Sequence, residues 1–300
     1  MRLGLIGHGA VATLALDALG RNLGEPLEAL ICLARPQSAG KAHAWASRYK
    51  WQVARDIVVE TSLAAFLAAR PNVVAEAAGH TALAEAGASV LAAGVDLVVS
   101  AVGALSDDDL LSGLEGASRG SGAALILSPG AIGGLDILAA ARLSGLYEVR
   151  YTSRKPPLAW RGTKADGLVC LDGLRSEAVF FEGSAREAAR LFPQNANVAA
   201  TIALAGAGMD ATHVRLVADP TVSCNQHEIE IRSVCADLSI RIEGHPTLIN
   251  PKTSATTGYA LANILLERLI AESRASSASQ ITDPSCVCPL RPVASSNPRV

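Results

Sequence analysis

Three small residues near the N-terminus have a spacing that suits phosphate binding. Gly7, Gly9 and Ala12 form a Gly-x-Gly-x-x-Ala pattern between an apolar segment at 2–6 and a helical pattern that begins at Ala10. Gly7 permits a tight turn, Gly9 lets the backbone approach a ligand without a Cβ in the way, and Ala12 allows close helix–strand packing. The first N–H groups of such a helix bind phosphate. The pattern predicts a dinucleotide site that includes Ala10, rather than only a tight turn.

The residue that follows the second strand pattern indicates which dinucleotide is bound. This strand, expected at 28–33, ends about twenty residues after the glycines, where folds selective for NAD usually carry Asp or Glu. The chain has Ala34-Arg35-Pro36 instead, and an Arg at this place can bind a 2′-phosphate. We therefore expect NADP to be accepted at least as well as NAD, unless Arg35 is an ordinary surface cation.

His227 is the side chain in the second half of the chain that best suits proton transfer. It lies on a strand pattern between Asn225 and Glu228. Imidazole exchanges protons near neutral pH. The alternative is a structural histidine, which is the commoner role of an isolated His on a strand.

Polar, Asn-rich segments around this histidine carry a resemblance to a known family. They lie at 192–201, 218–220 with 225–227, and 250–254, and they are joined by Pro129–Asp136 and Arg154–Pro157. In order and spacing these segments resemble the L-aspartate dehydrogenase family, from residue 1 to about 270. The chain departs from the family pattern at 232–237, where a small Gly-containing turn is missing, and beyond about 274.

The resemblance implies a reaction and some of its residues. The reaction is the NAD(P)-dependent oxidation of L-aspartate to iminosuccinate, which hydrolyses to oxaloacetate and ammonia or feeds pyridine nucleotide biosynthesis. The family's active-site histidine falls on His227. Its nucleotide contacts beyond the glycine turn fall on Ala131 and Asn197, although Asn197 could instead cap the helix that follows it.

A dicarboxylate substrate needs cations and directed donors. Lys252, Thr253 and Ser254 offer an ammonium group and two hydroxyls before a helix N-terminus, which favours anions. Lys155 or its neighbour Arg154 could supply a second contact. The alternative for Thr253 and Ser254 is plain helix capping.

The elements that position these residues fall into two groups. Strand patterns near 2–6, 28–33, 72–76, 95–100 and 123–127 alternate with helical patterns near 10–20, 62–69, 80–93 and 106–119. This alternation predicts an α/β fold with an N-terminal Rossmann domain, a doubly wound parallel sheet, at 1–130.

A change of pattern after this half predicts a second α+β domain at 131–254. Strand patterns follow one another at 148–154, 177–182, 213–218, 227–232 and 238–243, interrupted by helical patterns at 184–191 and 197–206. Such succession predicts a mostly antiparallel sheet with helices on one face. A helix at about 255–273 is expected to pack back on the first domain. The Ser- and Pro-rich segment 274–300 is expected to be a disordered tail.

Composition narrows the function further. The 300 residues are 50% hydrophobic and 18% charged with a net charge of −2, which suits two folded domains and argues against a nucleic-acid partner. No apolar run predicts a membrane span or a signal peptide, so we expect a soluble, cytoplasmic protein without membrane partners. We also expect a homodimer, although no sequence pattern fixes the oligomeric state. The scattered cysteines contain no C-x-x-C, and no metal site is expected.

Two other functions fit the first domain equally well. One is a reductase or dehydrogenase of the dihydrodipicolinate reductase or homoserine dehydrogenase type, and the other is a non-catalytic NAD(P) sensor. Only the second-domain segments separate these from L-aspartate oxidation.

Overall fold

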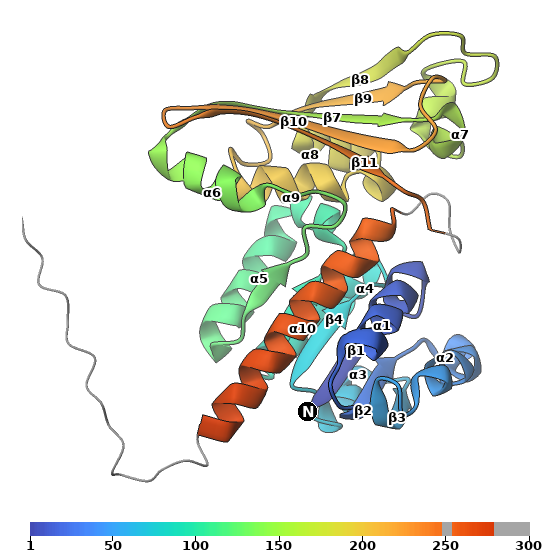
Figure 1. Ribbon diagram of the computed structural model, residues 1–300, viewed down its shortest axis with the longest axis vertical. Coiled ribbons are helices and arrows are strands. Elements are labelled where there is room, and N and C mark those ends of the chain that lie inside the picture. The colour runs from blue at the N-terminus through green and yellow to red at the C-terminus, as the bar shows by residue number, and fades with distance from the viewer. Residues whose placement is uncertain (248–253, 279–300) are drawn as a thin grey trace, which may run out of the picture.

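The computed structural model describes residues 1–247 and 254–278, which form two sheets with helices packed against both (Figure 1). The N-terminal half holds a six-stranded sheet in the order β3-β2-β1-β4-β5-β6, with all neighbours parallel. Its strands are β1 (Arg2–Ile6), β2 (Leu27–Leu33), β3 (Ala54–Glu60), β4 (Val73–Glu76), β5 (Asp96–Val99) and β6 (Leu125–Leu127). The strand order reverses between β1 and β4, which confirms the doubly wound parallel sheet.

Helices cover both faces of this sheet. They are α1 (Ala10–Asn22), α2 (Ala39–Ala46), α3 (Leu63–Ala68), α4 (His80–Ala92) and α5 (Asp108–Ser121), with 3-10 turns η1 (Pro36–Ser38), η2 (Ser47–Tyr49) and η3 (Val102–Ser106). One apolar core joins α1 to one face, and a second joins α3, α4 and α5 to the other. Because both faces are covered, central strands are buried throughout, as in β4.

The sequence analysis assigns no element between 33 and 62, and this is wrong. The segment contains α2 and β3, and β3 completes the sheet at one edge. Its residues Arg55 and Asp56 are exposed, and its apolar run is limited to Ile57, Val58 and Val59, which are only partly buried. Such a short run does not by itself identify a strand. Helix α6 (Leu135–Ser144) was likewise not expected.

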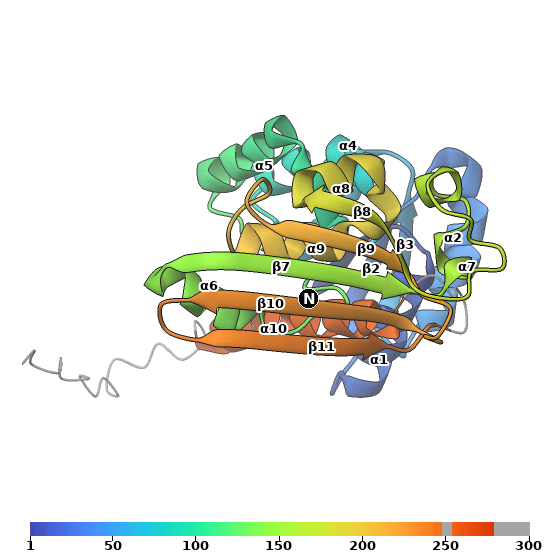
Figure 2. The same ribbon diagram turned by 90° about the horizontal axis from the view of Figure 1, so that it is seen from above.

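The second half folds into a five-stranded sheet in the order β11-β10-β7-β9-β8. Its strands are β7 (Leu146–Lys155), β8 (Ala178–Ser184), β9 (His213–Ala218), β10 (Asn225–Ser233) and β11 (Asp237–Gly244). All neighbours are antiparallel except β7 and β9, so the predicted mostly antiparallel sheet is confirmed. The helices on its inner face include α6, α8 (Ala185–Leu191) and α9 (Asn197–Ala205), and the short α7 (Pro157–Trp160) follows β7 (Figure 2).

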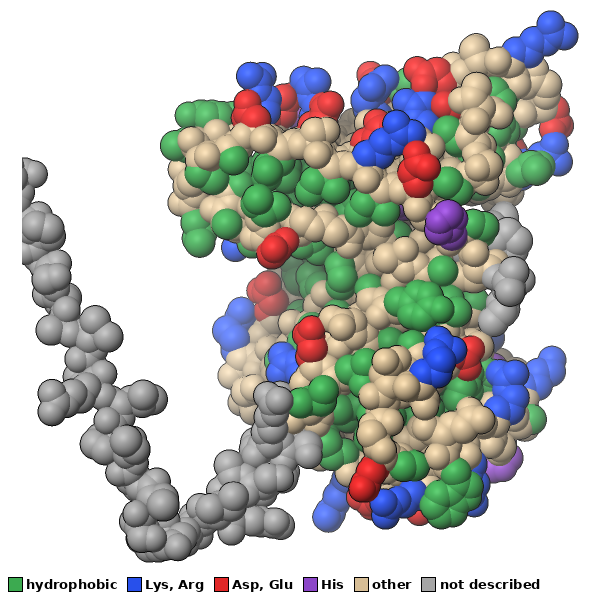
Figure 3. Space-filling view, in the orientation of Figure 1, with side chains coloured by type: hydrophobic (Ala, Val, Ile, Leu, Met, Phe, Trp, Pro, Cys, Tyr) green, Lys and Arg blue, Asp and Glu red, His purple; other side chains and the backbone are tan. Residues whose placement is uncertain are grey.

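Alternation along β7 separates the two faces of this sheet. Val149, Tyr151, Ser153 and Lys155 are buried on the inner face, which turns toward the helices and the first sheet. The residues between them are more exposed, and Figure 3 shows charged side chains gathered along the outer face of the sheet. Functional side chains on the inner face are therefore shielded from water.

The last helix, α10 (Ala255–Ala278), returns to the first sheet and lies beside α1 (Figure 1). Leu261 and Leu265 share a core with α1, and Arg268 forms an ion pair with Asp96 at 3.1 Å. Residues 274–278 are helical, which corrects the predicted start of the tail, because no Gly or Pro interrupts this Ala-rich segment. Residues 279–300 lie outside the described part of the chain.

Arg186 on α8 ties the second domain to the first. Its guanidinium donates to both carboxylate oxygens of Asp210 at 2.7 and 2.9 Å, to the backbone oxygen of Ser106 at 2.7 Å and to Asp108 at 3.0 Å. Ser106 and Asp108 belong to the N-terminal half, where they end η3 and begin α5. This network fixes α8 against the first sheet near the carboxyl end of β5.

Close packing of α10 on α1 depends on Gly258. A Cβ built there would overlap the Cβ of Leu14 and stand 3.2 Å from the backbone oxygen of Val11. We expect Gly258→Ala to destabilise the protein by about 1–3 kcal/mol because the helices must separate. Gly113→Ala in α5 is the matched control, since a Cβ there meets no atom within 4 Å and should stabilise the helix by about 0.5–1 kcal/mol. Thermal unfolding should shift in opposite directions for the two variants, and a shared upward shift would contradict this packing.

Candidate functional site

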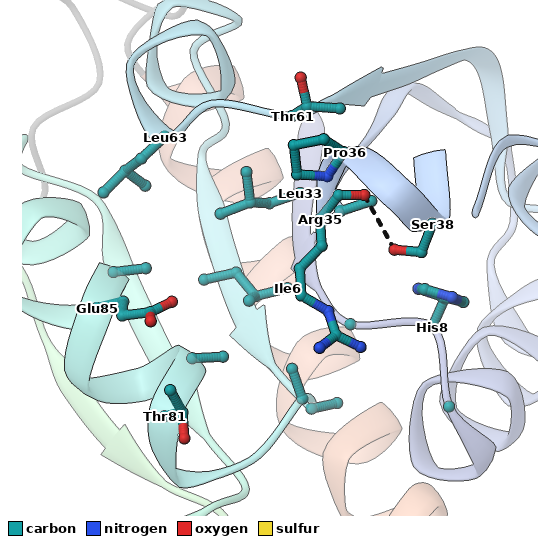
Figure 4. A pocket seen from close by; sticks show the side chains of 17 residues that line it. Ile6, His8, Leu33, Arg35, Pro36, Ser38, Thr61, Leu63, Thr81 and Glu85 are labelled. Carbon is teal, nitrogen blue, oxygen red and sulfur yellow. Dashed lines mark hydrogen bonds between the residues drawn. The ribbon is translucent and has the colours of Figure 1, made fainter. Parts of the chain in front are cut away.

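A cavity of about 790 Å³ opens beyond the carboxyl ends of β1, β2 and β4 (Figure 4). Its lining includes Gly7, Gly9 and Arg35, three residues that the sequence analysis assigns to a nucleotide. The volume is that of a typical small-molecule site, and its place is where ligands bind in open α/β sheets.

The glycine turn in this cavity fits a pyrophosphate. Gly7 has a φ of 101°, and a Cβ there would stand 2.9 Å from the backbone oxygen of Ala77. A Cβ on Gly9 would meet no protein atom within 4 Å, so its backbone faces open space. Helix α1 begins at Ala10 with no side-chain cap and no acidic residue in its first turn. Its N–H groups and dipole are therefore free to receive an anion.

Arg35 provides a positive charge in the same cavity. Its side chain extends among the lining residues (Figure 4), and within the described chain its guanidinium has no hydrogen bond or ion pair. The hydroxyl of Ser38 donates to the backbone oxygen of Arg35 at 3.0 Å and so closes the turn after β2. Glu85 on α4 is the acidic residue in the cavity lining.

Glu76, the last residue of β4, holds the loops that follow β4 and β5. This fully buried carboxylate accepts hydrogen bonds from the backbone N–H groups of Ala78 and Gly79, both at 2.7 Å, and of Ala101 at 2.9 Å. Ala78 and Gly79 follow β4, and Ala101 follows β5. One side chain therefore fixes two neighbouring loops at the carboxyl edge.

Those loops meet the second domain at Asn197, the first residue of α9. Its Oδ1 accepts a hydrogen bond from the backbone N–H of Gly103 at 2.9 Å and lies 3.4 Å from Nε2 of His80. Ala131 is buried in the segment between β6 and α6. Neither Asn197, Ala131 nor Ala10 lines the cavity beside Gly7. Asn197 lies at the contact between the domains, whereas Ala10 directly follows Gly9 at the start of α1.

His227 lies near the start of β10 on the inner face of the second sheet. It is 4% exposed, its Nδ1 is 2.7 Å from the hydroxyl of Tyr151, and the two rings stack with centroids 6.0 Å apart. Burial, and then the charge of Lys155, lower the pKa of His227 to about 3. The imidazole is therefore neutral at neutral pH, with Nδ1 held by a phenol whose own pKa is raised by burial.

Lys155 ends β7 on the same face. The register pairs His227 with Ser153, two residues before Lys155. Its Nζ donates to Oδ1 of Asn195 at 2.7 Å and lies 4.6 Å from the centre of the Trp160 ring. Burial lowers the pKa of Lys155 to about 8, and no carboxylate of the described chain lies within ion-pair distance. An enclosed ammonium without a counter-ion favours binding of an anion.

The other predicted substrate residues are placed differently. Arg154 points away from Lys155 and contacts Glu177, Asp219 at 2.7 Å and Glu228 at 3.8 Å, so it is already neutralised. Ser254 is buried at the start of α10, with its hydroxyl 3.4 Å from that of Thr256. Lys252 and Thr253 lie outside the described residues.

Three contact residues of this arrangement were not predicted from the sequence. Tyr151 and Asn195 hold His227 and Lys155, and Gly103 contacts Asn197. The period-two pattern of β7 could have placed Tyr151 on the face of Lys155. The contacts of Asn195 and Gly103 join segments far apart in sequence and leave no local signal.

Comparison with known proteins gives matches along both halves of the chain. A family model described as "Aspartate dehydrogenase, C-terminal" matches residues 136–268, and one described as "Homoserine dehydrogenase, NAD binding domain" matches residues 7–128. Together these models include every strand of the two sheets except β1, and they extend to residue 268 in α10.

The similar proteins share one description. The L-aspartate dehydrogenase of Ralstonia nicotianae is 50% identical over 204 residues, which cover 68% of this chain and 76% of that protein. The L-aspartate dehydrogenase of a Polaromonas species is 41% identical over 270 residues, covering 89% and 97%. A crystal structure of aspartate dehydrogenase from Thermotoga maritima is similar with a TM-score of 0.66 and 25% identity, covering 89% of this chain and 96% of that one.

The position of Arg35 generates a test of nucleotide choice. Arg35→Ala removes the unpaired guanidinium from the cavity, so the Kd of NADPH should rise by about 10- to 150-fold, the range for a charge-assisted contact, while that of NADH changes little. Fluorescence titration measures both constants. Arg55→Ala, which removes an exposed arginine paired with Glu25 on the edge strand, should change neither. Equal weakening of NADPH and NADH by Arg35→Ala would exclude a 2′-phosphate contact.

Proposed function

The chain belongs to the L-aspartate dehydrogenase family, and we propose that it oxidises L-aspartate to iminosuccinate with NAD or NADP as hydride acceptor. Iminosuccinate then hydrolyses to oxaloacetate and ammonia. The observation that supports this most directly is the buried, unpaired ammonium of Lys155 on the same sheet face as the neutral imidazole of His227. An anion site beside a proton acceptor suits an amino acid with two carboxylates.

Lys155 is proposed to bind one substrate carboxylate. Its ammonium keeps donors beyond the bond to Asn195, and the Trp160 ring and Asn195 hold it in one place. Exclusion of water strengthens the attraction between this cation and a carboxylate. The site therefore orients the substrate through a fixed charge.

His227 is proposed to move the protons. With Nδ1–H donating to the Tyr151 oxygen, Nε2 carries the lone pair that takes a proton from the substrate ammonium. After this proton has been released to solvent, the same atom takes a proton from the attacking water. The bound nicotinamide cofactor supplies the hydride acceptor. A carboxylate bound at Lys155 offsets the charge that lowers the pKa of His227, so substrate binding makes the imidazole a stronger base.

The rival functions receive less support. The homoserine dehydrogenase model matches only 7–128, the half that dinucleotide enzymes share, whereas the aspartate dehydrogenase model matches the half that holds His227 and Lys155.

We also propose, on the family resemblance, that the product feeds pyridine nucleotide biosynthesis and that the enzyme is a cytoplasmic homodimer. In the described residues, no helix has the length and apolar character needed to cross a membrane.

The substrate assignment is tested by initial rates of NAD(P)H formation. We expect L-aspartate to be oxidised and L-glutamate to react about 10- to 200-fold less efficiently, because a pocket built around a fixed cation discriminates against one additional methylene. The reverse reaction, with oxaloacetate and ammonia, should consume NAD(P)H. Equal efficiency with both amino acids would refute the assignment.

Removal of His227 should affect chemistry and not nucleotide binding. His227→Ala is expected to lower kcat by about 10²- to 10⁴-fold with NADPH affinity near that of the wild type, because the glycine turn lies in the other domain. Glu230→Ala, at an exposed position of the same strand, is the control and should change neither quantity. Retained turnover in His227→Ala would identify the residue as packing, and joint loss of binding and thermal stability would indicate a damaged fold.

The charge of Lys155 predicts a pH dependence. The ammonium is present below its pKa of about 8 and is lost above it, so affinity for a dicarboxylate should fall by up to tenfold per pH unit above pH 8. Succinate is the suitable probe, because it has two carboxylates and no titrating amine. Its inhibition constant should be constant between about pH 6.5 and 7.5 and rise above 8. Lys155→Met should give a weak, pH-independent constant, and a wild-type constant unchanged up to pH 10 would contradict this role.

A further inference from the structure

The contact of His80, Gly103 and Asn197 has a defined hydrogen-bond direction. A backbone N–H can only donate, so the Asn197 atom 2.9 Å from the Gly103 nitrogen must be the oxygen Oδ1. His80 Nε2, 3.4 Å from the same oxygen, must then carry a hydrogen. Both partners therefore act on one end of the Asn197 amide and leave the other end, the NH₂ group, turned away from them.

The NH₂ group of Asn197 is left without a protein partner. Asn197 is half-buried, and none of the described residues forms a hydrogen bond with its amide nitrogen. An amide NH₂ is a donor that accepts nothing, so a ligand that meets it must present an oxygen or another acceptor. The carbonyl oxygen of a nicotinamide carboxamide is such an acceptor.

The position of His80 is set by rigid neighbours. It is the first residue of α4 and follows Gly79, whose N–H is held by the buried Glu76 carboxylate. A Cβ on Gly103 would stand 2.7 Å from Oδ1 of Asn197 and 3.1 Å from Nε2 of His80, so only glycine leaves room for this contact. The imidazole, the glycine and the amide form one packed unit across the two domains.

We propose that His80 is a positioning residue that fixes the side-chain amide of Asn197 with its NH₂ group toward the cofactor carboxamide. This inference rests on the proposed use of NAD(P). Without the imidazole, one hydrogen bond from Gly103 remains to hold Oδ1, and the amide rotates more freely. His80 therefore affects the nicotinamide end of the cofactor and not the adenine end, which binds in the cavity beside Arg35.

Ligand binding without substrate tests this role. The dissociation constants of NADPH and of 2′-phospho-ADP-ribose, which lacks the nicotinamide ring, are measured for wild type, His80→Ala and His80→Gln. We expect His80→Ala to weaken NADPH by about 2- to 10-fold, the range for one neutral hydrogen bond, and to leave 2′-phospho-ADP-ribose unchanged. His80→Gln, which restores a side-chain N–H donor, should recover most of the NADPH affinity.

Asn197→Asp provides the second variant, since a carboxylate keeps the acceptor but has no NH₂ donor. It should weaken NADPH selectively, and adding His80→Ala to it should cause no further loss, because the group that His80 positions is absent. Equal weakening of both ligands by His80→Ala, or no change in either, would overturn the proposal. An additive loss in the double variant would do the same.

These measurements are independent of the amino-acid substrate. Absence of L-aspartate oxidation, with selective loss of NADPH affinity in His80→Ala, would refute the proposed function and leave the role of His80 standing. Normal L-aspartate oxidation with an unselective His80→Ala would refute the role of His80 alone.

Discussion

The buried carboxylate of Glu76 is the interaction on which the site depends. A carboxylate removed from water must be compensated, and here the described partners are backbone N–H groups of Ala78, Gly79 and Ala101. These groups belong to the loops after β4 and β5, so the charge fixes the carboxyl edge of the parallel sheet from within. The loops then set the backbone positions of His80 and Gly103. Through them the first domain reaches Asn197, where the second domain begins its helix α9.

In the second domain, the pairing register of β7 and β10 determines which polar side chains share the buried face. Antiparallel pairing of β7 with β10 sets His227 opposite Ser153, which brings Tyr151 and Lys155 to the same buried face. A shift of one residue would turn these side chains to the outer face. The Arg186 network holds this domain against α5 and against η3, the turn that contains Gly103. Sheet register therefore fixes the positions of the polar side chains on β7 and β10, and the Arg186 network fixes the position of their domain relative to the first.

Local sequence patterns predicted most of the strands and two of the polar side chains of the site, but not the partners of those side chains. The alternating strand and helix patterns predicted the doubly wound sheet. The edge strand β3 was missed because Arg55 and Asp56 are exposed and its apolar run is limited to the three residues that follow them. His227 and Lys155 were named from residue type and resemblance. Their partners Tyr151 and Asn195 depend on pairing between distant segments, which a local pattern does not encode.

Two adjacent cations on β7 differ in the partners that the described residues give them. Arg154 faces carboxylates of Glu177, Asp219 and Glu228, and these satisfy its guanidinium within the protein. Lys155 is the next residue and lies on the opposite face. Among the described residues, its ammonium donates to the neutral Oδ1 of Asn195 and lies over the ring of Trp160. Burial of an ammonium without a counter-ion is unfavourable, so an anion that binds beside Lys155 is stabilised. Burial, and then the charge of Lys155, lower the pKa of His227. In the proposed mechanism, a carboxylate bound at Lys155 offsets the second of these causes and makes the imidazole a stronger base.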